Sequence, residues 1–554
     1  MTVRQISGEF ETVTDVLRTA AAVNGDAEAH VEPRTAGSAR QRMTFAEWDR
    51  AADGVAGLLA RQGAGRGSVV CLMLPSSIDY MVCYAGAARL GAVTSGINLR
   101  LGGPEVTSIL GRTRPAVTVV EDGAPRPVGP LGAELERSEV RAAAGGPPPT
   151  RWPTLSSTDP VAVVWTSGTT GRPKGAVFDH RCLAAVAAGT DVLSEPGDRR
   201  LSPLPFAHVG SMTRVWDEIA SGVTTVITPT PWRAAEAIAI LVEERITVAQ
   251  GVPTQWALIL SHPGLVGATF TPLRIVGTGA STVPAELVAA LRNRFGVPVV
   301  VRYTSTESSL GTGTVPGDAD HVVATTVGRP VGGVELSVVD AAGRPVAVGE
   351  VGRVRLRSAA VMRGYWGGPP SGPGATGVVY DADATREVLA DDGWLTTGDS
   401  GRLDATGCLK LVGRSGERYI RGGYNVYPAE VEGVLSTHRA VDQVAVVAAP
   451  DPVLGEIGVA FVVPASGAKS EEATLLADLR AAARSALADY KAPDRLVVVD
   501  SLPLTSMMKV DKRPLAQRAA SLPPLRSGCS TGSPDHHRPE GEEQATDMNG
   551  ARTS

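Results

Sequence analysis

Cysteine is scarce in this 554-residue chain, and the few present form no pattern. The five cysteines (Cys71, Cys83, Cys182, Cys408 and Cys529) are scattered, odd in number and without CxxC spacing. This argues against a disulfide framework and against a cysteine-based metal site, and it is typical of a reducing compartment. The sequence also lacks any run of about eighteen apolar residues, and residues 1–9 contain no apolar signal-peptide core. We therefore expect a cytoplasmic protein without membrane insertion.

A strong excess of charge of either sign is also absent. The formal net charge is −5, with 20% charged and 43% hydrophobic residues. So small an imbalance over this length gives no reason to expect nucleic acid or an anionic membrane as a partner. The composition is that of a soluble globular protein, and the length exceeds what one hydrophobic core normally supports. Two or more domains are expected.

Apolar patterns of helical and strand period alternate through the first four hundred residues. Helices are predicted over 44–62, 77–90 and 284–295, and strands over 69–74, 116–120, 246–248, 273–276 and 298–301. Such alternation predicts an α/β fold with largely parallel sheets covered by helices. From about residue 328 short strands separated by glycine turns predict a β-rich subdomain that ends near residue 413.

A second change of composition falls near Gly413. Residues 414–520 are predicted to form a small, mobile α+β domain behind the large domain of residues 1–413. Residues 521–554 are rich in Pro, Ser, Gly and Glu and nearly free of apolar residues, so a disordered tail is expected there.

A hydroxyl- and glycine-rich loop is the most informative segment. Residues 166–175 read Thr-Ser-Gly-Thr-Thr-Gly-Arg-Pro-Lys-Gly and directly follow the apolar run 161–165. A strand that ends in such a loop brings backbone N–H groups, hydroxyls and one ammonium to a single point, as a polyphosphate requires. Lys174 is followed by glycine and not by Ser or Thr, so the loop is not a Walker A motif. We interpret it as a nucleotide-phosphate loop; the alternative is a Gly/Thr surface turn.

Further polar or glycine-rich segments follow in order, at residues 205–210, 277–280, 303–307, 394–399, 413–414, 421–430 and 504–512. With the loop, they resemble the motifs of the adenylate-forming superfamily. That superfamily includes acyl- and aryl-CoA synthetases, beetle luciferases and the adenylation domains of nonribosomal peptide synthetases. The resemblance extends over about residues 12–518 and is closest to a stand-alone acyl-CoA ligase.

The resemblance implies ATP, Mg²⁺ and coenzyme A as cofactor and co-substrates, and it assigns roles position by position. The implied catalytic residues are Lys509, Glu307, Thr306 and His208, of which Glu307 and Thr306 are also the metal ligands. The implied ATP/AMP-binding residues are Thr166, Ser167, Gly168, Thr169, Thr170, Lys174, Gly279, Ala280, Tyr303, Thr304, Asp399 and Arg414. The implied acyl pocket consists of Val209, Gly210, Ser211, Trp216, Trp256, Gly277 and Ser305. Gly422 and Gly423 would line the CoA tunnel, and Gly416 would lie at the hinge.

These residue types suit the chemistry that the resemblance implies. A carboxylate that attacks the α-phosphorus of ATP brings two anions together, so charge must be neutralised and an in-line geometry held. Glu307 is a hard oxygen ligand for Mg²⁺, and Asp399 can accept hydrogen bonds from ribose hydroxyls. Lys509 would place a positive charge where the carboxylate meets the α-phosphate. Taken singly, each could instead be a surface or capping side chain.

Three positions depart from the family pattern. Gly416 stands where Lys or Asp is usual, Met507-Met508 precede the catalytic lysine in place of a glycine, and Thr304 replaces a common glycine after Tyr303. An enzyme that performs mainly one half-reaction, with a partner ligase for the other, is therefore one alternative.

The substrate and the acceptor follow from the implied pocket. Val209 falls where amino-acid-activating relatives place an aspartate, and burying an ammonium against valine would be costly. An apolar or aromatic carboxylic acid, bulky polycyclic or fatty, is therefore expected. Coenzyme A is the expected acceptor, because no carrier-protein domain follows in the sequence. A ligase that loads a separate carrier protein and a non-catalytic acyl-nucleotide sensor are the alternatives. We expect a monomer or a homodimer.

Overall fold

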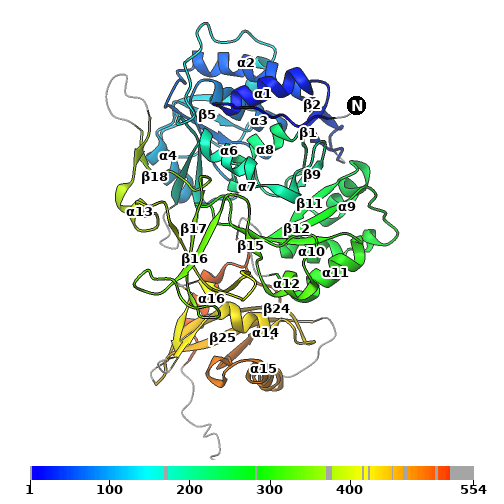
Figure 1. Ribbon diagram of the computed structural model, residues 1–554, viewed down its shortest axis with the longest axis vertical. Coiled ribbons are helices and arrows are strands. Elements are labelled where there is room, and N and C mark those ends of the chain that lie inside the picture. Colours follow the sequence, from blue (N-terminus) through cyan, green and yellow to red (C-terminus); the bar gives the residue numbers. More distant parts are fainter. Residues whose placement is uncertain are drawn as a thin grey trace, which may run out of the picture.

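The computed structural model describes residues 3–35, 37–166, 173–280, 283–369, 377–414, 417–421, 424–451, 453–465, 472–505 and 509–523. Two large sheets with helices between and around them form the upper part of the molecule in Figure 1, and a smaller sheet forms the foot. The α/β class predicted from the alternating pattern is confirmed.

The first large sheet has eight strands in the order β19-β18-β8-β7-β4-β3-β5-β6. Its strands are β3 (Val69–Met73), β4 (Val93–Gly96), β5 (Val117–Val120), β6 (Ala133–Glu136), β7 (Pro160–Thr166), β8 (Lys174–Asp179), β18 (Gly364–Gly368) and β19 (Val379–Tyr380). The run from β7 to β6 is parallel, whereas β8, β18 and β19 are joined by antiparallel pairing. The predicted phosphate loop therefore connects β7 to β8 across a hairpin.

The second large sheet has nine strands in the order β15-β14-β13-β12-β11-β9-β10-β1-β2. Its strands are β1 (Glu28–Glu32), β2 (Gln41–Thr44), β9 (Arg199–Ser202), β10 (Thr224–Ile227), β11 (Val248–Gly251), β12 (Ile275–Gly279), β13 (Val299–Tyr303), β14 (Thr312–Gly313) and β15 (Arg329–Pro330). The strands from β1 to β13 in this order are parallel. Because ligands of parallel sheets bind at the carboxyl ends of the strands, the ends of β9, β12 and β13 are where a site is expected.

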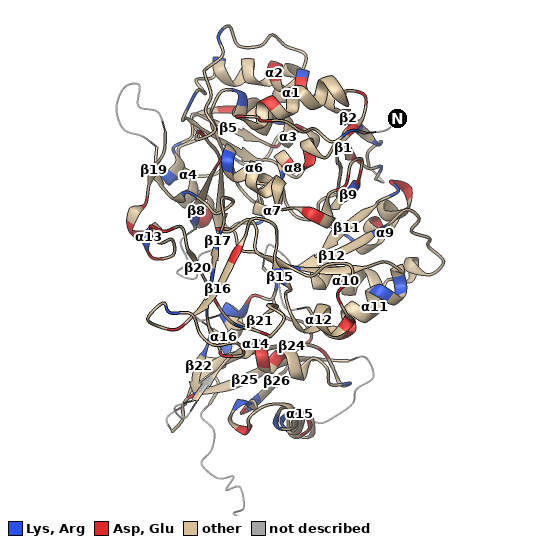
Figure 2. Ribbon diagram, viewed as in Figure 1, with Lys and Arg blue, Asp and Glu red and all other residues tan. Residues whose placement is uncertain are grey.

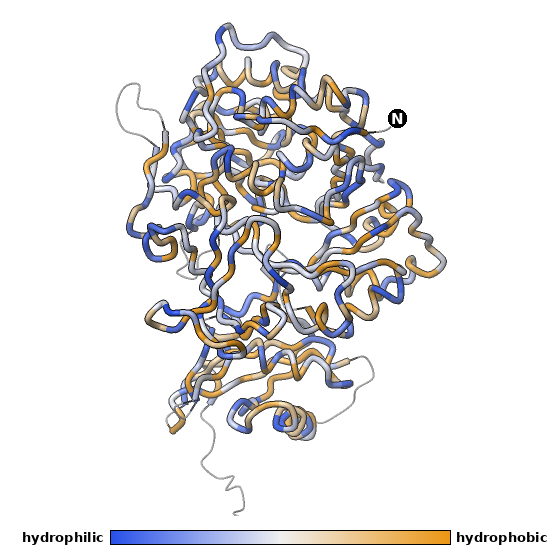
Figure 3. Tube along the Cα trace, viewed as in Figure 1, coloured by the Kyte–Doolittle hydropathy of each residue, from blue (hydrophilic) through white to orange (hydrophobic). Residues whose placement is uncertain are grey.

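The helices cover both large sheets and share their apolar faces with them. They are α1 (Val13–Val23), α2 (Phe45–Arg61), α3 (Ile78–Arg89), α4 (Gly103–Thr113), α5 (Arg137–Ala143), α6 (His180–Ala188), α7 (Val209–Met212), α8 (Val215–Ala220), α9 (Ala234–Glu243), α10 (Pro253–Ser261), α11 (Ala285–Phe295), α12 (Asp320–Thr325) and α13 (Ala382–Arg386). Short 3₁₀ turns are η1 (Asp191–Leu193), η2 (Pro263–Leu265) and η3 (Asp489–Lys491). Hydrophobic segments follow the central strands and the helix faces turned toward them (Figure 3).

Local sequence explains where several elements begin and end. The helix predicted over 44–62 is α2, because Thr44 and Glu47 form a capping box that binds the free N–H groups of its first turn. The strand predicted over 246–248 begins only at Val248. Arg245 adopts a left-handed conformation with φ of 50° after α9, so the chain turns there before it becomes extended.

Two smaller sheets complete the fold. The first is antiparallel, with strands β16 (Glu335–Val339), β17 (Gly352–Arg357), β20 (Leu395–Leu403) and β21 (Leu409–Arg414). The second has its own apolar clusters and consists of β22 (Tyr419–Arg421), β23 (Tyr424–Val426), β24 (Val441–Asp451), β25 (Gly455–Pro464) and β26 (Arg495–Val498). Around it lie α14 (Pro428–Leu435), α15 (Glu472–Ala486) and α16 (Lys512–Ala520). A mobile domain over residues 414–520 stays a prediction, and residues 524–554 of the predicted tail lie outside the described residues.

Positively and negatively charged residues are interspersed along the ribbon (Figure 2). Within the described part of the chain, every helix falls short of the length and hydrophobicity needed to cross a bilayer.

Candidate active site

The described ends of the phosphate loop lie beside a predicted metal ligand. Thr166 and Lys174 face each other in the β7–β8 register. The Lys174 ammonium lies 5.2 Å from the centroid of the Tyr365 ring and 3.1 Å from Oε2 of Glu387. The Tyr365 hydroxyl in turn donates to Oε1 of Glu307 at 2.7 Å. Lys174 and Glu307 therefore belong to one neighbourhood, whereas Ser167, Gly168, Thr169 and Thr170 lie outside the described residues.

Glu307 suits a divalent cation because its carboxylate is half-buried and only partly occupied. One oxygen accepts from Tyr365, which fixes the orientation of the carboxylate, and the backbone carbonyl of Glu307 accepts from Met362 N at 2.8 Å. The second carboxylate oxygen and the Thr306 hydroxyl have no hydrogen-bond partner among the described residues. Oxygen ligands of this kind, held by a neighbouring hydrogen bond, are what Mg²⁺ requires.

Three strands bring Tyr303, Asp399 and Arg414 together. The Tyr303 hydroxyl donates to Oδ2 of Asp399 at 2.6 Å, and Nε of Arg414 donates to Oδ1 at 3.1 Å. Asp399 and Arg414 are neighbours in the β20–β21 register, and Tyr303 comes from the end of β13. Each carboxylate oxygen keeps a free lone pair, so Asp399 can still accept from a sugar hydroxyl. Tyr303 is only 8% exposed, which limits the ring face that it offers to a base.

Lys509 follows the last strand of the C-terminal sheet, between β26 and α16. It lies in a hairpin-like segment in which Leu504 bridges to Val510, and its backbone N–H donates to the Thr505 hydroxyl at 3.2 Å. Burial, followed by repulsion from Arg414, lowers the pKa of the half-buried Lys509 ammonium, and attraction to Asp399 opposes that shift. The charges of both side chains therefore act on the Lys509 ammonium. Met507 and Met508 lie outside the described residues.

His208 faces the same space from the start of α7. Its Nδ1 accepts a hydrogen bond from Gly210 N at 3.3 Å, which leaves Nε2 as the nitrogen available to a ligand. Burial, with a smaller contribution from the nearby Lys509 charge, lowers the pKa of His208 to about 4. The imidazole is therefore neutral at neutral pH.

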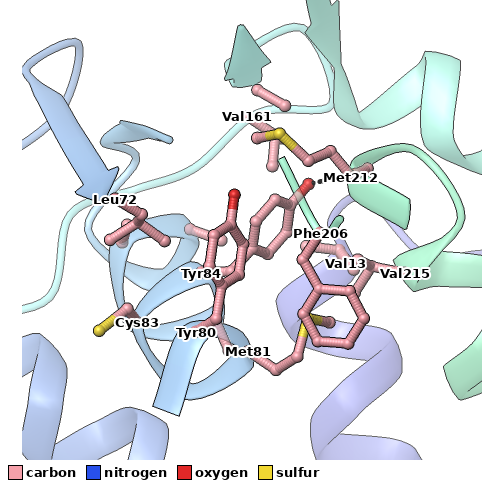
Figure 4. Packing of buried hydrophobic residues seen from close by; sticks show 14 of the residues in the cluster. Val13, Leu72, Tyr80, Met81, Cys83, Tyr84, Val161, Phe206, Met212 and Val215 are labelled. Atoms are coloured by element: carbon pink, nitrogen blue, oxygen red, sulfur yellow. Dashed lines mark hydrogen bonds between the residues drawn. The ribbon is translucent and has the colours of Figure 1, made fainter. Parts of the chain in front are cut away.

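The predicted acyl-pocket residues divide into a surface set and a core set. Gly210 is exposed and Ser305 half-buried in a turn with Ser308, whereas the others are buried: Val209, Ser211, Trp216, Trp256 and Gly277. The back of α7 is tied to α3 by the Tyr84 hydroxyl, which donates to Met212 O at 2.8 Å (Figure 4). Val209 and Trp216 pack into that same apolar cluster.

Trp256 lies behind β12 and not beside Gly210. Its exposed fraction is 1%, its ring meets Phe295 edge to face with centroids 5.8 Å apart, and Nε1 donates to Gly277 O at 3.2 Å. It therefore contacts the main chain of Gly277 from the core side, and its place in the pocket wall stays a prediction.

The end of β12 has tight backbone geometry. A Cβ at Gly279 would lie 2.2 Å from Arg302 O, and Ala280 adopts a left-handed conformation with φ of 67°. Ala280 and Thr304 are both exposed at neighbouring strand ends. Only glycine fits at residue 279, and the backbone is strained at the turn that follows it.

Sequence reasoning missed Tyr365 and Glu387. Tyr365 is 58 residues from Glu307 in the sequence and Glu387 is 213 from Lys174, so no local spacing relates them. Gly416, Gly422 and Gly423 lie outside the described residues, and their predicted roles at the hinge and the CoA tunnel stay predictions.

Residues 17–366 match the family described as AMP-binding enzyme, and residues 430–509 match the AMP-binding enzyme C-terminal domain. The chain is 32% identical to the indoleacetate–CoA ligase of Aromatoleum aromaticum, over 89% of this chain and 97% of that one. It is 31% identical to a fatty acid–[acyl-carrier-protein] ligase of Streptomyces coeruleorubidus, over 86% and 91%. Among solved structures, an anthranilate CoA ligase in complex with anthranoyl-AMP superposes with a TM-score of 0.81, at 25% identity, over 93% and 98%.

Proposed function

This chain belongs to the AMP-binding, adenylate-forming enzyme family, and on that premise we propose that it is an AMP-forming acid–thiol ligase, an acyl-CoA synthetase. The observation that carries the proposal is the position of Lys509. The charges of Asp399 and Arg414 both act on its ammonium, and Asp399 in turn accepts a hydrogen bond from Tyr303 at the end of β13. One positive charge is thus available where a carboxylate and a phosphate must meet.

In the first half-reaction, a carboxylate oxygen of the acid forms a bond to the α-phosphorus of ATP. The bond from that phosphorus to the β-phosphate oxygen breaks, and pyrophosphate leaves. Lys509 stabilises the charge on the five-coordinate phosphorus, and Lys174 with the loop hydroxyls binds the departing pyrophosphate. Asp399 and Arg414 hold the ribose. Glu307 and Thr306 would hold Mg²⁺, which would neutralise part of the phosphate charge.

In the second half-reaction, the thiol sulfur of coenzyme A bonds to the acyl carbon and AMP leaves. Lys509 is not needed for this step, and we infer that residues 414–520 rotate to withdraw it. Gly422 and Gly423 would then border the path of the pantetheine arm, where side chains would leave no room. The Cβ-bearing Met507-Met508 pair would limit how Lys509 is delivered.

The acid is inferred to be apolar or aromatic. Val209 in place of a carboxylate, the exposed Gly210 and the apolar cluster behind α7 favour a hydrophobic acyl group over an amino acid. Two of the proteins named above support the same class of substrate. The indoleacetate–CoA ligase and the anthranilate CoA ligase are each named for an aromatic acid.

A carrier protein is the alternative acceptor. The relative from Streptomyces coeruleorubidus is named for an acyl-carrier-protein substrate, and its similarity to this chain is close to that of the indoleacetate ligase. The two acceptors differ only in what carries the pantetheine thiol.

An acid panel separates these functions. Pyrophosphate exchange into ATP that depends on an added aryl, fatty or polycyclic acid would establish adenylation. Consumption of free CoA thiol with the active acid is the expected result. Exchange without CoA consumption, but with transfer to a carrier protein, would replace CoA as the acceptor. ATP binding without exchange for any acid would show a sensor and not an enzyme.

The lowered pKa of Lys509 predicts an early alkaline loss of adenylation. The ammonium must carry its proton to attract two anions, so kcat/KM for exchange falls as pH rises through the pKa of Lys509 in the free enzyme. Because that pKa is below the ordinary 10.5, the fall begins at a lower pH than an exposed lysine would give. The Lys509→Arg variant, whose side chain stays protonated, should lack this limb. An identical alkaline limb in both proteins would contradict the assignment.

A further inference from the structure

A charged cluster lies behind the start of α8. Arg200 contacts Asp217 at 3.4 Å and Glu218 at 3.2 Å, while Arg214 contacts Asp217 at 2.9 Å. The Ser194 hydroxyl donates to the same oxygen of Asp217 at 2.8 Å. The side chains of Arg200 and Asp217 are each 2% exposed, whereas that of Arg214 is 14% exposed. Arg214 is thus the least buried of the four charged side chains in the cluster.

The backbone brings Arg214 close behind the predicted acyl-pocket residues of α7. α7 ends at Met212, and in the turn that follows Arg214 N donates to Ser211 O at 3.1 Å, before Glu218 N donates to Arg214 O at 3.0 Å in α8. Arg214 therefore lies one turn beyond the exposed Gly210.

A second chain of contacts leads from Arg214 to Gly277. The Arg214 guanidinium lies 3.4 Å from the Ser194 hydroxyl. The preceding residue, Leu193, has its Cδ2 3.7 Å from the position that a Cβ would take at Gly277. Gln250 lies on the other side of that position, with its Cγ at 3.4 Å. Arg214 is therefore at the far end of the region that Gly210 and Gly277 border.

The Arg214 guanidinium has unused donors. Both of its hydrogen bonds come from Nη2, and Nε is buried without a partner in the described part of the chain. A guanidinium has five N–H donors, and a buried donor left without an acceptor is costly. The guanidinium groups of Arg200 and Arg214 share the carboxylate of Asp217. Burial raises the pKa of Glu218, so Glu218 is a weaker counter-charge for these two groups. The cluster therefore has spare capacity for an acceptor oxygen.

We propose that Arg214 is a specificity-determining residue that binds a carbonyl oxygen, of a ketone or of a second carboxylate, at the end of the acid remote from the reacting carboxyl. The proposal rests on the proposed function and narrows its substrate class to oxygenated apolar acids. The apolar wall would hold the body of the acid, and the Nη donors of Arg214 would hold its distal oxygen. An acid without that oxygen would leave these donors unpaired.

Matched acids test this. Octanoate is compared with 7-oxooctanoate and suberate, and 3-cyclohexylpropanoate with its 4-oxo and 4-carboxy ring derivatives. The same oxo and carboxy substitutions are made on the most active apolar acid of the panel. In pyrophosphate exchange, kcat/KM should favour an oxygenated acid over its parent by about 10- to 100-fold. A ketone preferred over a carboxylate, or the reverse, identifies the distal group.

The Arg214→Met variant should lose this preference while it still activates the unsubstituted parent acid. Arg233→Met is the matched control, because the Arg233 side chain is 69% exposed and its ion pair with Glu236 is long at 4.0 Å. The Arg233→Met variant should keep the preference for oxygenated acids. Arg214→Lys, which keeps the charge but not the fork, should give an intermediate ratio if the methionine variant does not fold.

Two outcomes would overturn the proposal: wild-type protein that treats every matched set alike, or a preference that persists in Arg214→Met. Activation of parent acids without preference refutes the role of Arg214 and leaves the ligase function standing. Absence of exchange with every acid refutes the ligase function, and the inference falls with it.

Discussion

Replacing Lys509 with alanine should lower acid-dependent ATP–pyrophosphate exchange by about 100- to 1,000-fold, the loss typical when one group that stabilises transition-state charge is removed. The charges of Asp399 and Arg414 both act on the Lys509 ammonium. Thioester formation from supplied acyl-adenylate and CoA should persist, because the thiol attacks the acyl carbon and not the phosphorus. Both rates are measured on the same preparation.

The control for this variant is Lys512→Ala. Lys512 is three residues away and its ammonium is already paired, with Glu417 at 3.2 Å and Glu432 at 2.8 Å. Its loss should leave the exchange rate within a few-fold of wild type. Equal loss of exchange and of thioester formation in Lys509→Ala would contradict the inferred rotation of residues 414–520.

Replacing Glu307 with glutamine should weaken the apparent affinity for Mg²⁺ in the exchange reaction by about 10- to 100-fold, with a lower rate at saturation. Glutamine keeps the size of the side chain and an oxygen that can accept from Tyr365, but it loses the negative charge that a hard cation requires. The measurement is the Mg²⁺ dependence of exchange at fixed ATP and acid.

Tyr365→Phe provides the matched comparison. It retains the carboxylate and removes only the hydrogen bond that orients it, so the Mg²⁺ curve should shift less than in Glu307→Gln. An unchanged Mg²⁺ curve in Glu307→Gln would remove Glu307 from the metal site.

Sequence pattern predicted much of the fold because local chemistry determines it. The capping box of Thr44 and Glu47 fixes the start of α2, and β-branched runs such as Val299–Val301 become central strands. The strand predicted over residues 246–248 begins only at Val248, because Arg245 adopts a left-handed conformation that apolar spacing does not indicate.

The candidate site was predictable only where a motif carried it. Asp399 and Glu307 were identified from short segments, but their partners were not. Tyr365 lies on β18, which pairs with β8, whereas Glu307 follows β13 of the other large sheet, so their hydrogen bond joins distant parts of the chain. Arg214 had no signal of its own, since its unpaired donors become visible only when Ser194 and Asp217 are placed beside it.

The arrangement at Asp399 has a consequence for how quickly a nucleotide can be accepted. Tyr303 and Arg414 already hold both carboxylate oxygens, so the side chain has lost its rotational freedom before any sugar arrives. The entropy of immobilising it is thus spent during folding and not at each turnover. A ribose meets an acceptor that is already aimed, and the empty protein keeps that acceptor's orientation between catalytic cycles.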